Sequence, residues 1–268
     1  MIIIGEKING AIPSIRQAIA QRDEALILER TLAQAKAGAS FLDCAPSTST
    51  EIEYETMVWL IGLMQGCTDV PLCIDSPDAR LLARILEEGH VKKPGMVNSV
   101  SEEGDKCDLI FPLIAGTPWE VVGLTCDRDG IPADPQKKVE IAKRIIDKAD
   151  RYGVALEQLH IDPCVMALAT TPTAMEDFVS CIQAIHAYAP RVKVTGAISN
   201  ISFEMPARKY VNMNCLAYAM AAGLDSAILD PTSGDVMGTI CACEALRMTD
   251  KGGRKYNRAY RKGLFGKK

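Results

Sequence analysis

The stretch Val192-Lys-Val-Thr-Gly-Ala-Ile-Ser-Asn-Ile-Ser202 shows the pattern around which the chain is organised. A β-branched run continues through Gly196 and ends at Ser199 and Asn200, where apolar side chains give way to hydrogen-bonding groups. A single asparagine after a strand is usually a turn residue. The same change from an apolar run to a polar residue recurs about eight times along the chain, however, and several of these residues are Asp or Asn. We therefore interpret it as a repeated strand end.

Eight apolar segments alternate with segments of helical periodicity. The expected strands span residues 1–4, 40–45, 70–76, 95–99, 121–126, 159–163, 192–202 and 226–231. The expected helices span 25–37, 51–65, 78–88, 135–152, 173–188, 213–222 and 236–247, whereas 106–115 fits either a helix or a strand. Strands this apolar are typical of a parallel sheet that is covered on both faces.

A single (β/α)₈ barrel (TIM barrel) of the α/β class, formed by residues 1–250, fits this alternation best. The chain has 268 residues, and such barrels need about 250. A dinucleotide-binding fold would place a Gly-rich phosphate turn after its first strand. Here the first strand leads into Glu6-Lys-Ile-Asn-Gly10, which lacks that pattern.

The composition excludes several classes of protein. A net charge of −4 argues against nucleic acid as a partner. The ten cysteines form no C-x-x-C pair, so we interpret them as reduced thiols packed as small hydrophobes. With only His90, His160 and His186 available, no metal site is expected. No export signal and no apolar run of about 18 residues are found, so we expect a cytoplasmic protein without a membrane partner.

Residues 251–268 differ from the rest of the chain. They contain eight Lys or Arg residues and no Asp or Glu, interleaved with Tyr256, Tyr260 and Phe265. This segment is either a solvated tail or a packed C-terminal arm. The alternative is a docking strip for an acidic protein partner, because runs of one charge sign steer association.

The polar residues that follow the expected strands are the candidate site. In a (β/α)₈ barrel the carboxyl ends of the strands surround one mouth, where the chemistry takes place. The residues placed there are Glu6, Asn9, Asp43, Asp75, Asn98, Thr125, Asp162, Ser199, Asn200 and Asp230. Each could instead cap the following helix. Strand-terminal carboxylates are nevertheless costly unless a ligand supplies donors, which favours a functional role for Asp75, Asn98, Asp162 and Asn200.

The residue types at this mouth indicate the chemistry of the ligand. Several acceptors, few cations and no phosphate-binding loop argue against sugar phosphates. A carboxylate can accept two parallel hydrogen bonds from a planar edge such as the 2-amino and N3–H groups of a pterin. Asparagine both donates and accepts, which suits a ring nitrogen that gains or loses a proton.

Six short motifs carry a resemblance to a known family. They are Gly5-Glu-Lys-Ile-Asn-Gly10, Leu42-Asp43, Cys73-Ile-Asp-Ser76, Val97-Asn-Ser99, Ile161-Asp-Pro163 and Ile198-Ser-Asn-Ile-Ser202. In this order the chain, from Met1 to about Arg247, resembles the pterin-binding methyltransferase family. That family includes the methyltetrahydrofolate:corrinoid protein methyltransferases and the folate domain of cobalamin-dependent methionine synthase.

The resemblance implies a function and a set of partners. It implies a barrel, usually a homodimer, that holds tetrahydrofolate or 5-methyltetrahydrofolate at the mouth while a separate corrinoid protein presents cobalt. A methyl group would pass between the corrinoid and N5 of the folate, in methylotrophic or acetogenic one-carbon metabolism.

Residue roles carry over by position. Asp162 would bind the 2-amino/N3 edge, and Asp75 and Asn98 would bind other pterin nitrogens. Asn200 would hydrogen-bond N5 as the catalytic residue, with Ser199 beside it as a further pterin-binding residue. Further members of the mouth would be Glu6, Asp43 and Arg208, and the anionic glutamate tail of the folate would point toward Lys7, Arg208 or Lys209.

Two departures point to one branch of the family. Ala197 stands where the acetogenic enzymes carry Gly, and Phe203 where they carry a polar side chain; the loop 204–210 also differs. With the basic tail, these features make the chain resemble the methylotrophic branch, such as the glycine betaine-specific methylcorrinoid:tetrahydrofolate methyltransferases.

Three alternatives remain at this point. Dihydropteroate synthase shares the barrel and the pterin site, but it carries Asn-x-Thr-Pro-Asp-Ser-Phe and Ser-Arg-Lys motifs where this chain has Ile8-Asn-Gly-Ala-Ile12 and Ser199-Asn-Ile-Ser202. A zinc-dependent corrinoid methyltransferase would need a Cys/His set. A non-catalytic folate-binding subunit of a methyltransferase complex is the third alternative.

Overall fold

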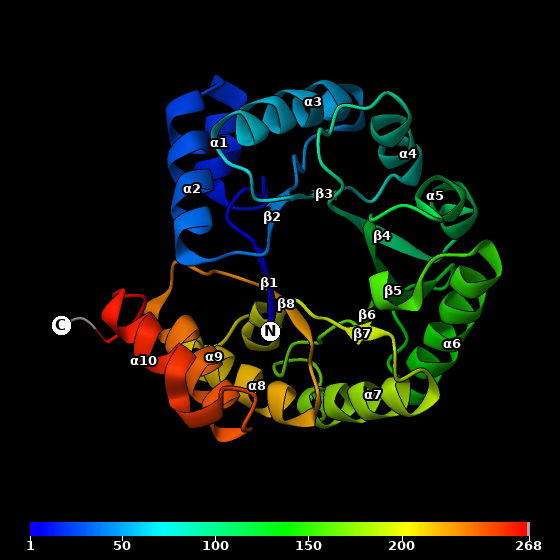
Figure 1. Ribbon diagram of the computed structural model, residues 1–268. Coiled ribbons are helices and arrows are strands. Elements are labelled where there is room, and N and C mark those ends of the chain that lie inside the picture. Colours follow the sequence, from blue (N-terminus) through cyan, green and yellow to red (C-terminus); the bar gives the residue numbers. More distant parts are fainter. Residues whose placement is uncertain (267–268) are drawn as a thin grey trace.

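Eight parallel strands form a ring whose closure depends on the residues after the seventh strand. In the computed structural model, which describes residues 1–266, the hydrogen-bonded order is β7-β6-β5-β4-β3-β2-β1-β8. The gap between the two end strands is closed by a parallel bridge between Ala197 and Ile228. The amide of Ile228 also donates to the carbonyl of Gly196 at 3.0 Å. The predicted (β/α)₈ barrel is therefore confirmed (Figure 1).

The elements follow the predicted alternation closely. The strands are β1 (Ile2–Gly5), β2 (Phe41–Cys44), β3 (Leu72–Asp75), β4 (Met96–Glu102), β5 (Glu120–Asp127), β6 (Leu159–Asp162), β7 (Lys193–Val194) and β8 (Ser226–Leu229). The α-helices are α1 (Pro13–Gln21), α2 (Glu24–Ala37), α3 (Thr50–Cys67), α4 (Ala79–Glu87), α5 (Lys106–Ile114), α6 (Pro135–Tyr152), α7 (Ala174–Tyr188), α8 (Arg208–Ala222), α9 (Gly234–Leu246) and α10 (Arg254–Arg261). Three short 3₁₀-helices are η1 (Leu156–Gln158), η2 (Ile198–Ser202) and η3 (Lys251–Gly253).

The end signals of α6 show why the helix boundaries were predictable. The side chain of Asp134 accepts a hydrogen bond from the amide of Gln136, and Pro135 occupies the first turn, where no amide hydrogen is needed. Gly153 ends the helix with φ of 78°, a left-handed conformation that favours glycine. Ile141 and Ile145 lie one turn apart on the buried face. These signals together fix both ends of the helix.

The prediction of one strand over 192–202 was wrong in its second half. Only Lys193–Val194 form β7, and Ile198–Ser202 form the 3₁₀-helix η2. A Cβ at Gly196 would lie 2.8 Å from the ring of Phe178, so glycine is required where the chain passes α7. Beyond that point the backbone bonds to itself, with the amide of Asn200 donating to the carbonyl of Ala197 at 3.2 Å. The apolar run thus reflects burial in a turn rather than a continued strand.

Two other segments complete the comparison with prediction. Residues 13–21 form α1, a helix that the sequence analysis did not anticipate, and they bury Ile15, Ala18 and Ile19. The ambiguous segment 106–115 is the helix α5, despite Pro112 in its last turn.

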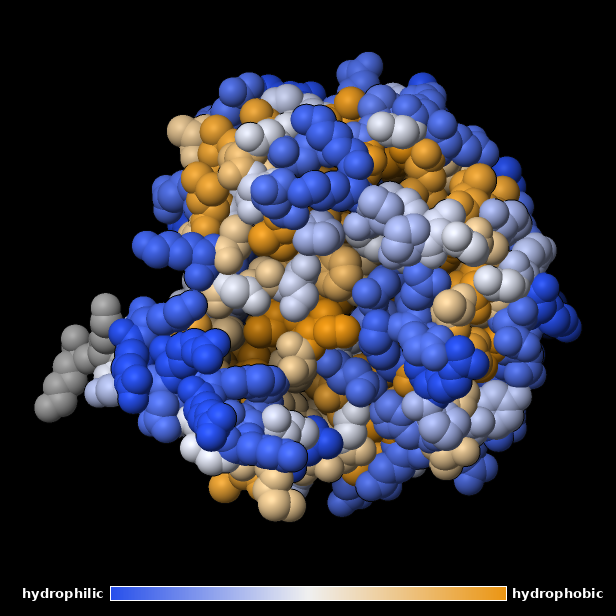
Figure 2. Space-filling view, viewed as in Figure 1, coloured by the Kyte–Doolittle hydropathy of each residue, from blue (hydrophilic) through white to orange (hydrophobic). Residues whose placement is uncertain are grey.

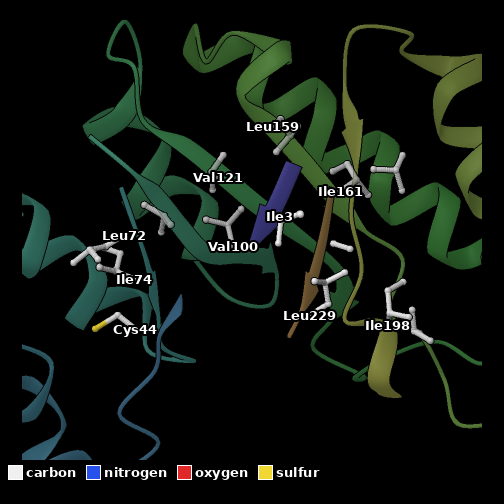
Figure 3. Close-up of a cluster of buried hydrophobic side chains, with 14 of the residues drawn as sticks. Ile3, Cys44, Leu72, Ile74, Val100, Val121, Leu159, Ile161, Ile198 and Leu229 are labelled. Carbon is white, nitrogen blue, oxygen red and sulfur yellow. The ribbon is translucent and has the colours of Figure 1, made fainter. Parts of the chain in front are cut away.

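The core has two layers, one inside the barrel and one between the strands and the helices. The inner layer is small and consists of Ile4, Phe41, Cys73, Met96 and Val122. Their neighbours in the strands point the other way, because side chains alternate along a strand, and Ile74, Val121 and Ile161 belong to the large outer cluster shown in Figure 3. Leu124 and Ile228 pack on the inner layer from one end.

Residues 251–266 of the basic C-terminal segment form a packed arm, not a solvated tail, and residues 267 and 268 lie outside the described residues. Ala259 of α10 and Phe265 are buried against Cys241 of α9. The ring of Phe265 lies 4.9 Å from that of Tyr256 and 6.1 Å from that of Tyr260, measured between ring centroids. Across residues 1–266 no helix is long and apolar enough to cross a membrane.

Removing part of the outer core should destabilise the barrel strongly. Ile161 of β6 is fully buried in the core layer between the strands and the helices. Ile161→Ala therefore leaves a cavity and should lower the free energy of unfolding by about 2–5 kcal/mol. Ile52 of α3 is 49% exposed, and Ile52→Ala should change it by less than about 0.5 kcal/mol. Urea denaturation followed by circular dichroism measures both values. Equal losses in the two variants would contradict the assignment of the core.

Candidate functional site

A cavity of about 980 Å³ opens where the strands end. Its floor includes Leu124 and Ile228, which also pack on the inner core layer. The structure brings together nine of the ten polar residues predicted for the mouth, and these line the cavity: Glu6, Asn9, Asp43, Asp75, Asn98, Asp162, Ser199, Asn200 and Asp230. Lys7, Arg208 and Lys209 line it as well.

Thr125 is the exception, and its prediction as a member of the mouth was wrong. Its side chain is fully buried, and its hydroxyl lies 4.0 Å from the sulfur of Cys164. Side chains alternate along β5, so Leu124 points into the cavity and Thr125 points out of the barrel.

The register of β3 and β4 places two of the predicted ligand residues side by side. The Cα atoms of Asp75 and Asn98 are paired directly across the two strands. The amide of Ser76 donates to the carbonyl of Asn98 at 3.0 Å, which extends the pairing by one residue. Residues 23 positions apart in the sequence therefore present their side chains from one wall of the cavity.

A buried glutamate that the sequence analysis missed supports this wall. Glu53 of α3 is only 4% exposed, and its Oε1 accepts a hydrogen bond of 2.7 Å from the hydroxyl of Ser76. Burial, with the nearby charge of Glu53, raises the pKa of Asp75 to about 7. The only signal in the sequence was the amphipathic pattern of α3, in which a glutamate ordinarily faces solvent.

Asp43 is the least exposed of the carboxylates of the mouth, at 1%. Its Oδ2 accepts a hydrogen bond of 3.4 Å from Asn9, whereas its Oδ1 is buried without a hydrogen-bond partner among residues 1–266. Burial and then the neighbouring charge of Asp75 raise the pKa of Asp43 well above its usual range. An unpartnered buried acceptor is costly, so this oxygen fits a ligand or water that donates a hydrogen bond.

Asp162 stands at the end of β6, next to Leu124 of β5 in the strand register. It is 5% exposed, and its Oδ1 accepts a 2.7 Å hydrogen bond from the amide of Cys164. Burial raises its pKa to about 6. Lys138, a second residue that the sequence analysis missed, is buried behind this turn and donates to the carbonyl of Cys164 at 2.8 Å.

The opposite wall is the 3₁₀-helix η2, which carries Ser199 and Asn200. Arg208 holds it in place: Nη2 donates to the carbonyl of Ser199 at 2.7 Å and Nε to the hydroxyl of Ser202 at 2.9 Å. Its guanidinium also lies 5.0 Å from the ring centroid of Phe203. No side chain within residues 1–266 hydrogen-bonds the side-chain amide of Asn200, which lines the cavity. That amide is thus available to a ligand.

The cations at the outer part of the cavity differ in how far they are neutralised. Lys7 lies 3.0 Å from a carboxylate oxygen of Asp230, and Lys209 lies 3.4 Å from one of Asp235. Arg208 has no carboxylate within 4 Å in the described part of the chain. Burial raises the pKa of Glu6, and the charge of Lys7 partly offsets that effect.

The polar groups that line the cavity suit a planar, nitrogen-rich ligand better than a metal ion. No group of three or more His, Cys, Asp or Glu residues in the described chain could hold a metal. The buried acceptors of Asp43, Asp75 and Asp162 instead fit N–H donors on a heterocycle edge.

The raised pKa of Asp162 has a measurable consequence for stability. The carboxyl titrates near 4 in an unfolded chain and at about 6 in the folded protein. The stability that Asp162 contributes is therefore fully present below about pH 4 and is lost as the pH rises through 6. Asp162→Asn does not titrate, so its free energy of unfolding, relative to the unmodified protein, should rise by on the order of 2–3 kcal/mol from pH 4 to pH 8.

Urea denaturation at a series of pH values measures this difference. Asp129→Asn is the matched control, because it removes a carboxylate whose side chain is 84% exposed. The same pH profile for the two variants would contradict a raised pKa at Asp162.

Comparison with known proteins adds sequence relatives to this geometry. Over 268 residues, which cover 99% of this chain and 98% of the relative, the chain is 46% identical to the methylcorrinoid:tetrahydrofolate methyltransferase of Eubacterium limosum. It is 31% identical over 242 residues to the methionine synthase of Mycobacterium tuberculosis, covering 85% of this chain but 20% of that much longer protein.

Solved structures agree on the fold. The dihydropteroate synthase of Xanthomonas albilineans in complex with 7,8-dihydropteroate superposes with a TM-score of 0.67, covering 92% of both chains at 17% sequence identity. An identity this low supports a common barrel and does not by itself indicate a shared reaction. The pterin binding enzyme family matches residues 9–230, which contain most of the barrel and of the cavity lining. The chain therefore belongs to the pterin binding enzyme family.

Proposed function

We propose that the protein transfers a methyl group between a methylated corrinoid protein and N5 of tetrahydrofolate, producing 5-methyltetrahydrofolate and the demethylated corrinoid protein in one direction. The observation that carries the proposal is the set of buried acceptors around the mouth, which line one cavity together with the free side-chain amide of Asn200. The full-length relative at 46% identity is a methylcorrinoid:tetrahydrofolate methyltransferase, which supports the same reaction for this chain.

The pterin ring is held by its nitrogen-bearing edge. Asp162 accepts from the 2-amino and N3–H groups, a pair of parallel donors that matches the two oxygens of a carboxylate. Asp75 and Asn98, adjacent in the strand register, bind other ring nitrogens. The apolar floor that includes Leu124 and Ile228 packs against the ring. These contacts stop the ring from rotating and leave N5 pointing toward η2.

Asn200 hydrogen-bonds N5, the atom that exchanges the methyl group, with Ser199 beside it. The corrinoid would supply a cobalt ion that keeps the electron pair of the cobalt–carbon bond when the methyl group leaves, and that donates this pair to the methyl carbon when it accepts the group. When N5 attacks the methyl carbon, the new N–C bond forms as the cobalt–carbon bond breaks, and N5 then releases its proton. In the reverse direction N5 is protonated as the methyl group leaves. Asn200 stabilises the charged nitrogen as a fixed dipole in both directions.

The barrel contributes chiefly alignment. A methyl transfer needs the donor, the methyl carbon and the acceptor in line, and correct orientation can lower a barrier by about 7–11 kcal/mol. The buried contacts of Ser76 with Glu53 and of Lys138 with the carbonyl of Cys164 fix the strand ends that carry Asp75 and Asp162. The ring position is thereby set before the partner arrives.

The folate tail leaves the cavity past Arg208. The glutamate of folate is anionic, and Arg208 is the cation of this region without a carboxylate partner among residues 1–266. Lys7 and Lys209 are each paired with an aspartate and contribute less positive charge. Glu6 and Asp43 complete the inner wall.

The site of action is the cytoplasm, in keeping with ten cysteines that are all unpaired, six of them buried. Residues 1–250 form the catalytic barrel. The homodimer that is usual among such enzymes stays a prediction.

The reaction is tested with purified protein, free methylcobalamin and tetrahydrofolate. We expect single-turnover decay of the methylcobalt absorbance together with formation of 5-methyltetrahydrofolate, and calorimetry should detect binding of tetrahydrofolate alone. Binding without any decay, also with a methylated corrinoid protein as donor, would identify a non-catalytic folate-binding subunit and contradict the proposal.

Asn200→Ala should reduce turnover without unfolding the protein. Loss of one preorganised contact to a developing charge costs about 2.7–4 kcal/mol in comparable sites, which corresponds to roughly a hundredfold or more in rate. The calorimetric affinity for tetrahydrofolate should change much less. Asn214→Ala, which alters an exposed asparagine of α8 whose side chain bonds only the carbonyl of Tyr210, is the matched control. Near-normal turnover of Asn200→Ala would remove this residue from the mechanism.

A further inference from the structure

Six basic residues form one exposed strip along the C-terminal arm. They are Lys251, Arg254, Lys255, Arg258, Arg261 and Lys262, and all are exposed. At about 100° per residue, the five from Arg254 onward project within roughly 120° of the helix circumference. Ala259, Tyr256 and Tyr260 point elsewhere, since Ala259 is buried against Cys241 and both tyrosines pack on Phe265. Below, these six residues are called the basic strip.

The charge of the basic strip is almost entirely unneutralised. Among residues 1–266 the only carboxylate within 4 Å of a side-chain nitrogen of the strip is that of Glu244, at 3.8 Å from Lys255, although Asp250 accepts a 2.9 Å hydrogen bond from the backbone amide of Lys255. The whole chain carries a net charge of −4, although residues 251–268 contribute eight positive charges and no negative one. The rest of the chain therefore carries −12. Figure 2 shows hydrophilic residues gathered over the region where Figure 1 places α10.

The basic strip ends beside the mouth of the barrel. Helix α9 begins at Gly234, next to Ser233, Asp235 and Val236, which line the cavity. The first turns of α9 contact the C-terminal end of the arm. A Cβ at Gly234 would lie 3.4 Å from the carbonyl oxygen of Leu264, and one at Gly238 would lie 3.4 Å from Phe265. Helix α10 thus runs alongside α9 toward the level of the cavity, with Lys262 close to that end.

We propose that the basic strip is a docking surface for an acidic face of the corrinoid protein. The proposal rests on the proposed function, because methyl transfer requires a corrinoid-bearing protein to cover the mouth. A partner seated over the cavity extends past α9 onto α10, where it meets uncompensated positive charge on a rigid helix. An acidic face on that partner would complement the strip, while the acidic remainder of this chain would repel it from other orientations.

Long-range attraction of this kind acts mainly on the rate of association. Fields from clustered charges raise association rates by about 10- to 1,000-fold, and salt screens them. The basic strip should therefore increase kcat/KM for the corrinoid protein and leave the chemistry at N5 unaffected.

The test compares two methyl donors in one double variant. Arg258→Glu/Arg261→Glu reverses two exposed charges that make no ion pair in residues 1–266. With a methylcobalamin-loaded corrinoid protein as donor, kcat/KM should fall by about tenfold or more at low ionic strength, and the difference should shrink as salt is added. With free methylcobalamin the variant should match the unmodified protein. No turnover of either donor by the unmodified protein would refute the proposed function rather than the role of the strip.

The matched control is Lys92→Glu/Arg151→Glu, which changes the net charge equally at two exposed positions outside the arm. Equal losses in the two double variants would show that only net charge matters and would overturn the proposal. A shift in sedimentation of the strip variant alone would assign the surface to a second copy of this chain. Co-sedimentation of only the unmodified protein with phosphatidylserine vesicles, without any donor effect, would assign it to a membrane. Either result would overturn docking of the corrinoid protein.

Discussion

The burial of carboxylates at the strand ends is the constraint on which the site depends. Asp43 and Asp162 are almost entirely removed from solvent, and Asp75 lines the same cavity. Burial raises the pKa of each of these carboxyl groups, because the charged form loses its hydration. The mouth is thus a locally unfavourable arrangement that a ligand with several N–H donors relieves. The same arrangement selects against anionic groups in the inner cavity, where they would meet the carboxylates.

Groups behind the cavity hold this arrangement in place. Glu53 accepts a hydrogen bond from Ser76 below Asp75, and Lys138 binds the carbonyl that follows Asp162 by two residues. On the other wall Arg208 plays the same part for the turn that contains Asn200. Each contact uses a charged side chain to fix a short segment of the chain, and two of these side chains, Glu53 and Lys138, are buried. The side chains that face the ligand can then keep some of their hydrogen-bonding groups, such as the side-chain amide of Asn200, available to it.

The sequence predicted the ring of strands and most of the mouth because both follow from short-range patterns. Apolar runs that end in Asp or Asn reveal a strand and its carboxyl end together, as at Asp75 and Asp162. Glu53 and Lys138 were missed because each lies on an otherwise amphipathic helix, and only the tertiary structure shows that it points inward. The prediction that Thr125 faces the mouth was wrong for a related reason. A shift of one residue along a strand exchanges the face inside the barrel for the face outside it. The turn at Ile198–Ser202 is as apolar as a strand, so the sequence pattern could not distinguish the two. The direction of the chain there depends on the close packing of Phe178 against Gly196, which only the tertiary structure shows.

In the proposed binding mode, an amide at N5 follows from the carboxylates that line the rest of the cavity. A titrating group at position 200 would interact with Asp75 and Asp43, whose pKa values burial already raises. The protonation state of that group would then change whenever Asp75 or Asp43 gained or lost a proton. Asn200 carries no charge, so its dipole can stabilise N5 in either protonation state at constant strength. The inner wall can therefore take up or release protons when the pterin binds while the hydrogen bond at the reacting nitrogen stays the same. This separation lets one site support methyl transfer in both directions.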